Sequence, residues 1–173
     1  SNGRTRAILL GRKGGPPRSW TEIAVTCAHY RLPEHPRRVQ VMLPPHPVTA
    51  ETLHAAAERR PELLGGAPAP RIVLLVGGSS RSHALSPSTA RQLGEEAARA
   101  VRAAGGSLFV VTSRRTGEAA TEALRQAVGN SGHVHVWRSD ETDNPYLSYL
   151  AQADVLVVTG ESEAMLAEAA ATG

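Results

Sequence analysis

Four short apolar runs, separated by segments with helical patterns, most strongly constrain the fold of this chain. The runs cover residues 72–76, 108–111, 134–137 and 155–158, and a polar turn with Gly or Ser follows each. Continuous runs joined by helices are typical of a parallel sheet that is covered on both faces and connected by right-handed crossovers. From residue 70 onward, the sequence therefore predicts an α/β fold, a Rossmann-like parallel sheet with helices on both faces.

Helix start and stop signals lie between these runs. Ser86 and Pro87 combine an N-cap with a proline at the first helical position, and Gly105 ends the same helix. A second helix is expected over residues 117–128, and a third begins after Asn144. The alternation of strand and helix is therefore regular in this part of the chain.

The first 65 residues follow a different pattern, with Pro- and Arg-rich connections that are too short for helices. The strands expected there cover residues 7–10, 23–26 and 39–43. A helix over residues 49–64 leads into a Gly- and Pro-rich segment, which predicts a linker. We expect residues 1–65 to be the trailing part of a first domain with its linker helix. Residues 70–173 then form a Rossmann-like domain that is truncated at its C-terminus, and the chain is a fragment of a longer protein.

The composition of the 173-residue chain is ordinary for a globular protein, with 41% hydrophobic and 20% charged residues. Aromatic residues make up only 3%, which removes the stacking surface of proteins that bind single-stranded nucleic acids. The net charge of +3 comes from scattered Arg residues rather than from a basic run. We therefore expect no nucleic-acid partner and a weak preference for anionic ligands.

The cysteine and histidine residues of the sequence do not predict a metal site. Cys27 is the single cysteine, which excludes an internal disulfide, and His133 and His135 lack a third ligand and are interpreted as structural. The sequence shows neither a segment long enough to span a membrane nor a secretory signal. We expect no metal, no transmembrane segment and a cytoplasmic protein, with peripheral attachment to the inner membrane left open.

Three polar turns follow expected strands at their carboxyl ends, which is where open parallel sheets bind ligands. The glycine pair in the loop over residues 77–83 allows backbone N–H groups to approach an anion closely. Hydroxyls and two guanidiniums precede the next helix. The candidates for binding a nucleotide or diphosphate are Gly77, Gly78, Ser79, Ser80, Ser113, Arg114, Arg115, Thr116, Thr159, Gly160, Glu161 and Ser162. Each turn alone has a structural alternative, a tight turn or a solvated Arg pair, so a ligand site is predicted from their convergence on one edge of the sheet.

The third turn opens a helix, because Ser162 precedes an Ala-rich segment that carries the carboxylate of Glu168 among apolar residues. Unpaired N–H groups and the positive dipole end of a helix suit a phosphate or carboxylate ligand. The carboxylate is suited to bind sugar hydroxyls. The alternative is that Ser162 is only an N-cap and Glu168 only a solvated helix residue.

Several nucleotide-site and nucleophile motifs are absent from the sequence. No G-x-G-x-x-G follows the first core strand, and Thr112 and Ser113 stand where an NAD site has an acid. The P-loop motif and the G-x-S-x-G elbow are also missing. What remains is recognition of a phosphorylated ligand by backbone amides and hydroxyls.

Three segments carry a family resemblance: GGSSRSH, GGSLFVVTSRRT and NPYLSYLAQADVLVVTGESEAMLAEAAATG. They resemble the mitochondrial-fission Elm family, which is also described as predicted nucleoside-diphosphate-sugar epimerases or glycosyltransferases. The segment YRLPEHPRRVQVMLPPHPVT resembles the stretch that joins the two halves of that family. The resemblance implies a GT-B glycosyltransferase with two Rossmann-like domains, of which this chain is mainly the C-terminal, donor-binding half.

The resemblance also implies site roles. The loop over residues 77–80 and the helix start at Ser162, with Met165, would approach the diphosphate, and Glu168 would bind the ribose. The family usually reads D-S-V-S-M where this chain has residues 161–165, so one hydroxyl is missing and Glu163 is added. Glu163 favours the helix dipole but would repel a bound diphosphate.

We therefore expect a nucleotide-sugar donor site for sugar transfer without metal or cofactor, in which helix-end amides and two arginines stabilise the leaving diphosphate. No catalytic base is identifiable, so the fragment is expected to bind donor without turnover. The acceptor stays open and includes saccharides and lipid-linked molecules. The alternatives are a nucleoside-diphosphate-sugar epimerase-like enzyme and a non-catalytic Rossmann scaffold with a protein partner.

Overall fold

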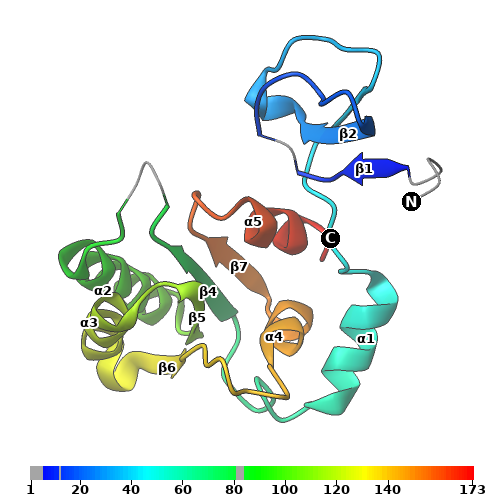
Figure 1. The fold of residues 1–173 in the computed structure, drawn as a ribbon. Helices are drawn as coiled ribbons and strands as arrows, with labels where there is room; N and C mark the ends of the chain where they lie inside the picture. Colours follow the sequence, from blue (N-terminus) through cyan, green and yellow to red (C-terminus); the bar gives the residue numbers. More distant parts are fainter. Residues whose placement is uncertain (1–5, 12, 81–83) are drawn as a thin grey trace. The chain divides into compact units, whose positions relative to one another are not determined.

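The computed structural model describes residues 6–11, 13–80 and 84–173, and it contains two compact units, Ser1–Pro47 and Val48–Gly173 (Figure 1). The sequence places a linker at residues 65–70. Helix α1 (Ala50–Arg59) nevertheless belongs to the second unit, because the Ser148 hydroxyl of α4 (Tyr146–Gln152) donates to the Ala56 carbonyl at 2.8 Å.

The first unit is a three-stranded parallel sheet in the order β1-β2-β3. Its elements are β1 (Ala7–Leu9), β2 (Thr21–Cys27), the 3-10 helix η1 (Ala28–Tyr30) and β3 (Arg38–Val41). The three strands predicted from the sequence are therefore present. Arg37 holds the connection before β2, since its guanidinium donates to the carbonyls of Ser19 at 3.0 Å and Thr21 at 2.8 Å.

The second unit contains a four-stranded parallel sheet in the order β6-β5-β4-β7. Its strands are β4 (Arg71–Gly78), β5 (Ser107–Arg115), β6 (Gly132–His135) and β7 (Val155–Val158). The chain runs outward from β4 to β6 and then returns to the other side of β4. A topological switch point therefore lies between β4 and β7. This order confirms the predicted Rossmann-like α/β fold.

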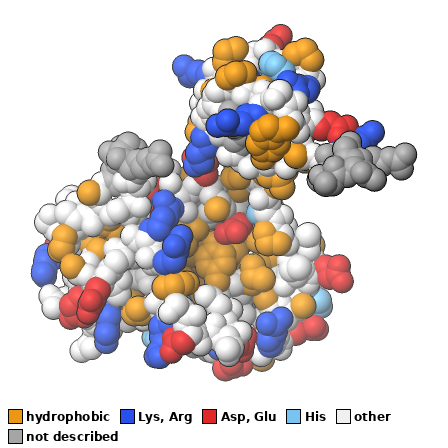
Figure 2. Space-filling model, viewed as in Figure 1, with side chains coloured by type: hydrophobic (Ala, Val, Ile, Leu, Met, Phe, Trp, Pro, Cys, Tyr) orange, Lys and Arg blue, Asp and Glu red, His pale blue; other side chains and the backbone are white. Residues whose placement is uncertain are grey.

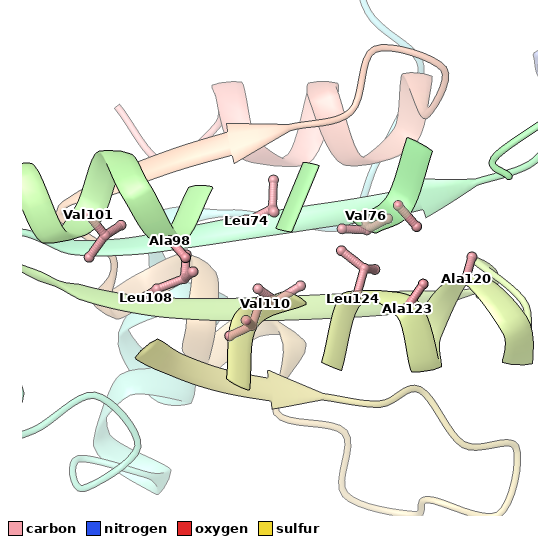
Figure 3. Close-up of a cluster of buried hydrophobic side chains, with 11 residues drawn as sticks. Leu74, Val76, Ala98, Val101, Leu108, Val110, Ala120, Ala123 and Leu124 are labelled. Atoms are coloured by element: carbon pink, nitrogen blue, oxygen red, sulfur yellow. The ribbon is translucent and has the colours of Figure 1, made fainter. Parts of the chain in front are cut away.

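Helices cover both faces of this sheet, as the alternation of side chains in β4 requires. Leu74 and Val76 pack against α2 (Pro87–Ala104) and α3 (Glu118–Val128) (Figure 3). Val73 and Leu75 face the opposite cluster, which includes side chains of α4 and α5 (Glu163–Ala170). Small residues let α2 and α3 approach closely, since a Cβ on Gly94 would lie 2.9 Å from the Ala127 Cβ.

The predicted helix boundaries follow from local capping. The Ser86 hydroxyl accepts the Thr89 N–H at 3.1 Å at the start of α2, and Gly105 ends that helix with a φ of 67°. Asn144 accepts the Tyr146 N–H at 2.9 Å before α4. The 3-10 helix η2 (Gly129–Ser131) follows α3. These contacts confirm the signals that the sequence gives for α2 and α4.

An ion pair joins the beginnings of β4 and β7. It is expected to make the stability of the folded state depend on pH. The Asp154 carboxylate accepts the Arg71 Nε at 2.9 Å, Nη2 at 2.7 Å and backbone N–H at 2.7 Å. These hydrogen bonds from the Arg71 side chain and then from its backbone hold the pKa of Asp154 far below its usual range. The charged form therefore stabilises the folded state at neutral pH, and this contribution is lost as the pH falls below about 4.

We expect Asp154→Asn to lower the Tm at pH 7, with the difference from the unmutated chain shrinking steadily between about pH 4 and pH 2. Thermal unfolding followed by circular dichroism across this range measures the difference. Asp140→Asn is the matched control, because Asp140 pairs at 3.0 Å with Arg138, only two residues away, and both side chains are about two-thirds exposed. Equal Tm changes in the two variants would contradict the role assigned to Asp154.

Candidate functional site

The carboxyl ends of β4 and β5 and the turn after β7 lie side by side at the carboxyl edge of the sheet. The Gly77 N–H donates to the Thr159 hydroxyl at 2.9 Å, and the Ser113 hydroxyl donates to the Gly77 carbonyl. Gly77, close to the end of β4, thus contacts both neighbouring segments, and the predicted turns begin within the last residues of β4 and β5. The structure brings the three predicted clusters together at the carboxyl edge of the sheet, while residues 81–83 of the first loop lie outside the described residues.

The carboxyl ends of β4 and β5 and the residues that follow them pack tightly together. Gly78 has a φ of 113°, and a Cβ at this position would lie 2.2 Å from the carbonyl carbon of Arg115. The Ser79 N–H donates to the Arg115 carbonyl at 3.1 Å, and the Thr116 hydroxyl donates to the Val76 carbonyl at 3.0 Å. Only glycine fits the position of Gly78, because its backbone conformation and the close approach both exclude a side chain.

The Glu161 carboxylate lies where the sequence predicts that an anionic ligand approaches the N–H groups of the glycine pair. Its Oε1 atom accepts the Gly78 N–H at 2.7 Å and the Thr159 hydroxyl at 2.9 Å. A Cβ on Gly77 would lie 2.3 Å from the same oxygen, so the carboxylate lies directly against the glycine pair. The N–H groups of both glycines are therefore paired within the chain in this structure.

The N-cap of α5 differs from the simple cap that the sequence allows. Ser162 is the N-cap residue and is only 5% exposed, yet its side chain accepts no capping hydrogen bond. The Ser162 hydroxyl therefore does not act as the capping acceptor that an N-cap serine usually supplies. Gly160 is exposed, with no heavy atom within 4 Å of a Cβ built there. Met165 is 8% exposed and belongs to the core below this turn.

Glu168 is half-buried and has a partner that sequence reasoning missed. The Tyr146 hydroxyl donates to Glu168 Oε2 at 2.7 Å, which joins α4 to α5. Burial, and then the hydrogen bond to Glu168, raise the pKa of Tyr146 far above its usual range. Tyr146 therefore remains a hydrogen-bond donor at any working pH. No spacing rule connects two residues on different helices, so the sequence alone gives no signal for this pair.

A groove of about 630 Å³ opens next to the turn after β5. Its lining includes Ser113, Arg114, Glu118, Arg125 and Trp137. Arg114 and the adjacent Arg115 are exposed, and basic side chains gather on the visible face of the second unit (Figure 2). The predicted residues Ser113 and Arg114 thus lie at the border between the switch point and this groove, and sequence reasoning missed Arg125 and Trp137.

Among the residues that the structure describes, no three His, Cys, Asp or Glu side chains gather in a way that could hold a metal ion. Within the same ranges, none of the helices combines the length and apolar character needed to cross a bilayer.

The fold and the joined turns define a Rossmann-like domain with a polar edge at its switch point. Residues 2–173 match the family described as Mitochondrial fission ELM1, and the chain belongs to this family. The mitochondrial fission protein ELM1 of Arabidopsis thaliana is 27% identical over 128 residues, which cover 74% of this chain and 30% of that relative. The matched part of the chain thus covers less than a third of the relative's length. No solved structure matches the chain significantly.

Proposed function

We propose that the second unit binds a nucleoside-diphosphate sugar at the edge between β4 and β7, as the donor-binding domain of a GT-B-type glycosyltransferase. The observation that carries this proposal is the hydrogen-bonded convergence of three polar turns at the topological switch point. Open parallel sheets bind ligands in the crevice at this point.

The residues divide into two groups by the chemistry that each offers. The start of α5, where the Ser162 side chain makes no capping hydrogen bond, together with Arg114 and Arg115, supplies donors and positive charge for a diphosphate. The Gly77 loop, including Ser79 and Ser80, forms the neighbouring wall. Glu168 offers a carboxylate for the ribose hydroxyls. The proposal assigns no metal or cofactor and leaves the base of the nucleotide open.

Sugar transfer is proposed for the whole protein, since this chain spans only part of its relative. No side chain of the described residues is assigned as a catalytic base, and we propose that this chain binds donor without turning it over. We propose a saccharide or a lipid-linked molecule as the acceptor of the sugar.

Calorimetric titration with UDP, GDP, ADP and CDP tests the proposal. We expect one of them to bind with a dissociation constant in the submillimolar range, and Arg114→Ala to weaken this binding about tenfold. Arg99→Ala is the matched control, because Arg99 is an exposed arginine on the last turns of α2, toward the amino ends of the strands. If none of the four binds at several millimolar while circular dichroism shows the native fold, the proposal is wrong.

One observation favours a second candidate, a non-catalytic scaffold that binds a protein partner. Glu161 accepts the hydrogen bond of the Gly78 N–H, so this N–H is not available to an anionic ligand. In addition, Val155 and Val157 on β7 are each 44% exposed. An apolar strand face of this kind can dock against another protein. This candidate predicts that no nucleotide binds even after the Glu161 charge has been removed.

A further inference from the structure

Tyr146 and Glu168 form a polar contact between two helices that otherwise pack through apolar side chains. Tyr146 is the first residue of α4, and its backbone N–H is fixed by the Asn144 side chain at 2.9 Å. The ring packs against the same core cluster that contains Tyr149 and Met165. The phenol is therefore held in place from both its backbone and its ring.

The hydrogen bond fixes one end of a flexible acid. Glu168 has three rotatable side-chain bonds, and a ligand that orders such a side chain loses affinity through the entropy cost. Because the Tyr146 hydroxyl donates a hydrogen bond to Glu168 Oε2 at 2.7 Å, the orientation of the carboxylate is set before any ligand binds. The Oε1 atom keeps its capacity to accept hydrogen bonds.

We propose that Tyr146 is a positioning residue, which holds Glu168 so that its free oxygen accepts a hydrogen bond from a ribose hydroxyl of the nucleotide. The inference rests on the proposed function and adds a specificity determinant to it. A carboxylate that is already oriented discriminates strongly against a ligand that lacks the hydroxyl, because the acceptor is then left without its donor. The pair should therefore select ribonucleotides over 2′-deoxyribonucleotides.

The test compares UDP, GDP, ADP and CDP with their 2′-deoxy counterparts by calorimetry, in the intact chain and in three variants. The unmutated chain is expected to prefer the ribonucleotide about tenfold or more. Glu168→Gln, which weakens the acceptor, should bring this ratio close to one. Tyr146→Phe keeps the ring and removes only the hydroxyl, and it should reduce the ratio to about threefold through weaker binding of the ribonucleotide.

Tyr149→Phe is the matched control, since Tyr149 lies on the same helix and is 1% exposed. It should leave the ratio unchanged even if the Tm shifts. A merely structural role of Tyr146 would lower the Tm or weaken both ligands equally, and an unchanged ratio in Tyr146→Phe overturns this inference alone. If no ribonucleotide binds the unmutated chain, the inference and the proposed function are both overturned.

Discussion

Gly78→Ala is expected to lower the free energy of unfolding of the second unit by about 3 to 5 kcal/mol. The added Cβ would lie 2.2 Å from the carbonyl carbon and oxygen of Arg115, which are backbone atoms at the end of the neighbouring strand β5. A φ of 113° is also strained for any residue with a side chain. Chemical denaturation gives the free energy, and the Tm should fall by about 10 °C or more.

Gly160→Ala is the matched control at the same edge of the sheet. A Cβ built on Gly160 has no heavy atom within 4 Å, so its free energy of unfolding should change by about 0.5 kcal/mol or less. Equal stability of the two variants would show that the carboxyl ends of β4 and β5 do not pack as closely as the structure has them.

The glycine pair shows how one sequence signal can have two physical causes. Its position after the first core strand predicts a backbone cradle for an anion. In the structure, Gly77 faces the Glu161 carboxylate and Gly78 faces the backbone of Arg115, so protein groups already require both glycines. Packing at the switch point is sufficient to explain the pair, and the role of these amides in ligand binding stays a prediction.

Periodicity and capping carried enough information to predict the fold from sequence. The apolar runs gave the strands, and signals such as Ser86 and Gly105 gave the ends of α2, because both depend on local interactions. The partners of Glu161 and Glu168 depend on contacts between residues far apart in the chain. Gly78 and Glu161 are 83 positions apart, and no local rule specifies which donor a flexible carboxylate finds.

The segment over residues 65–70 shows a limit of compositional reasoning. Its Gly and Pro content predicts a linker between domains. However, Leu64 is 1% exposed and shares a core cluster with Leu75, and the Gln152 side chain donates to the Arg60 carbonyl at 2.8 Å. Residues before the segment thus pack with residues far beyond it. Turn-forming composition marks a change of direction, whereas the extent of a compact unit depends on tertiary contacts.

Glu161→Gln is expected to strengthen the binding of a nucleoside diphosphate about tenfold, provided that the switch point is its site. The substitution keeps an oxygen that can accept the Gly78 N–H and the Thr159 hydroxyl but removes the negative charge. A carboxylate about 4 Å from a phosphate opposes binding by about 4 kcal/mol at the effective dielectric of a protein surface, and exposure to solvent reduces this repulsion. A net change of about 1.4 kcal/mol corresponds to the tenfold effect. Calorimetry with UDP, GDP, ADP and CDP measures it.

Glu163→Gln separates the effect of a charge beside the Gly78 amide from the effect of a charge elsewhere at the switch point. It removes the same charge from the first turn of α5, only two residues away, while the Glu161 carboxylate stays beside the Gly78 N–H. We expect it to strengthen binding about threefold or less. Equal gains in both variants would mean that net charge alone controls affinity and that the position of the Glu161 carboxylate beside the Gly78 amide has no special effect. A lack of nucleotide binding in the unmutated chain and in both variants would instead favour the scaffold, because removing either charge would then have opened no anion site.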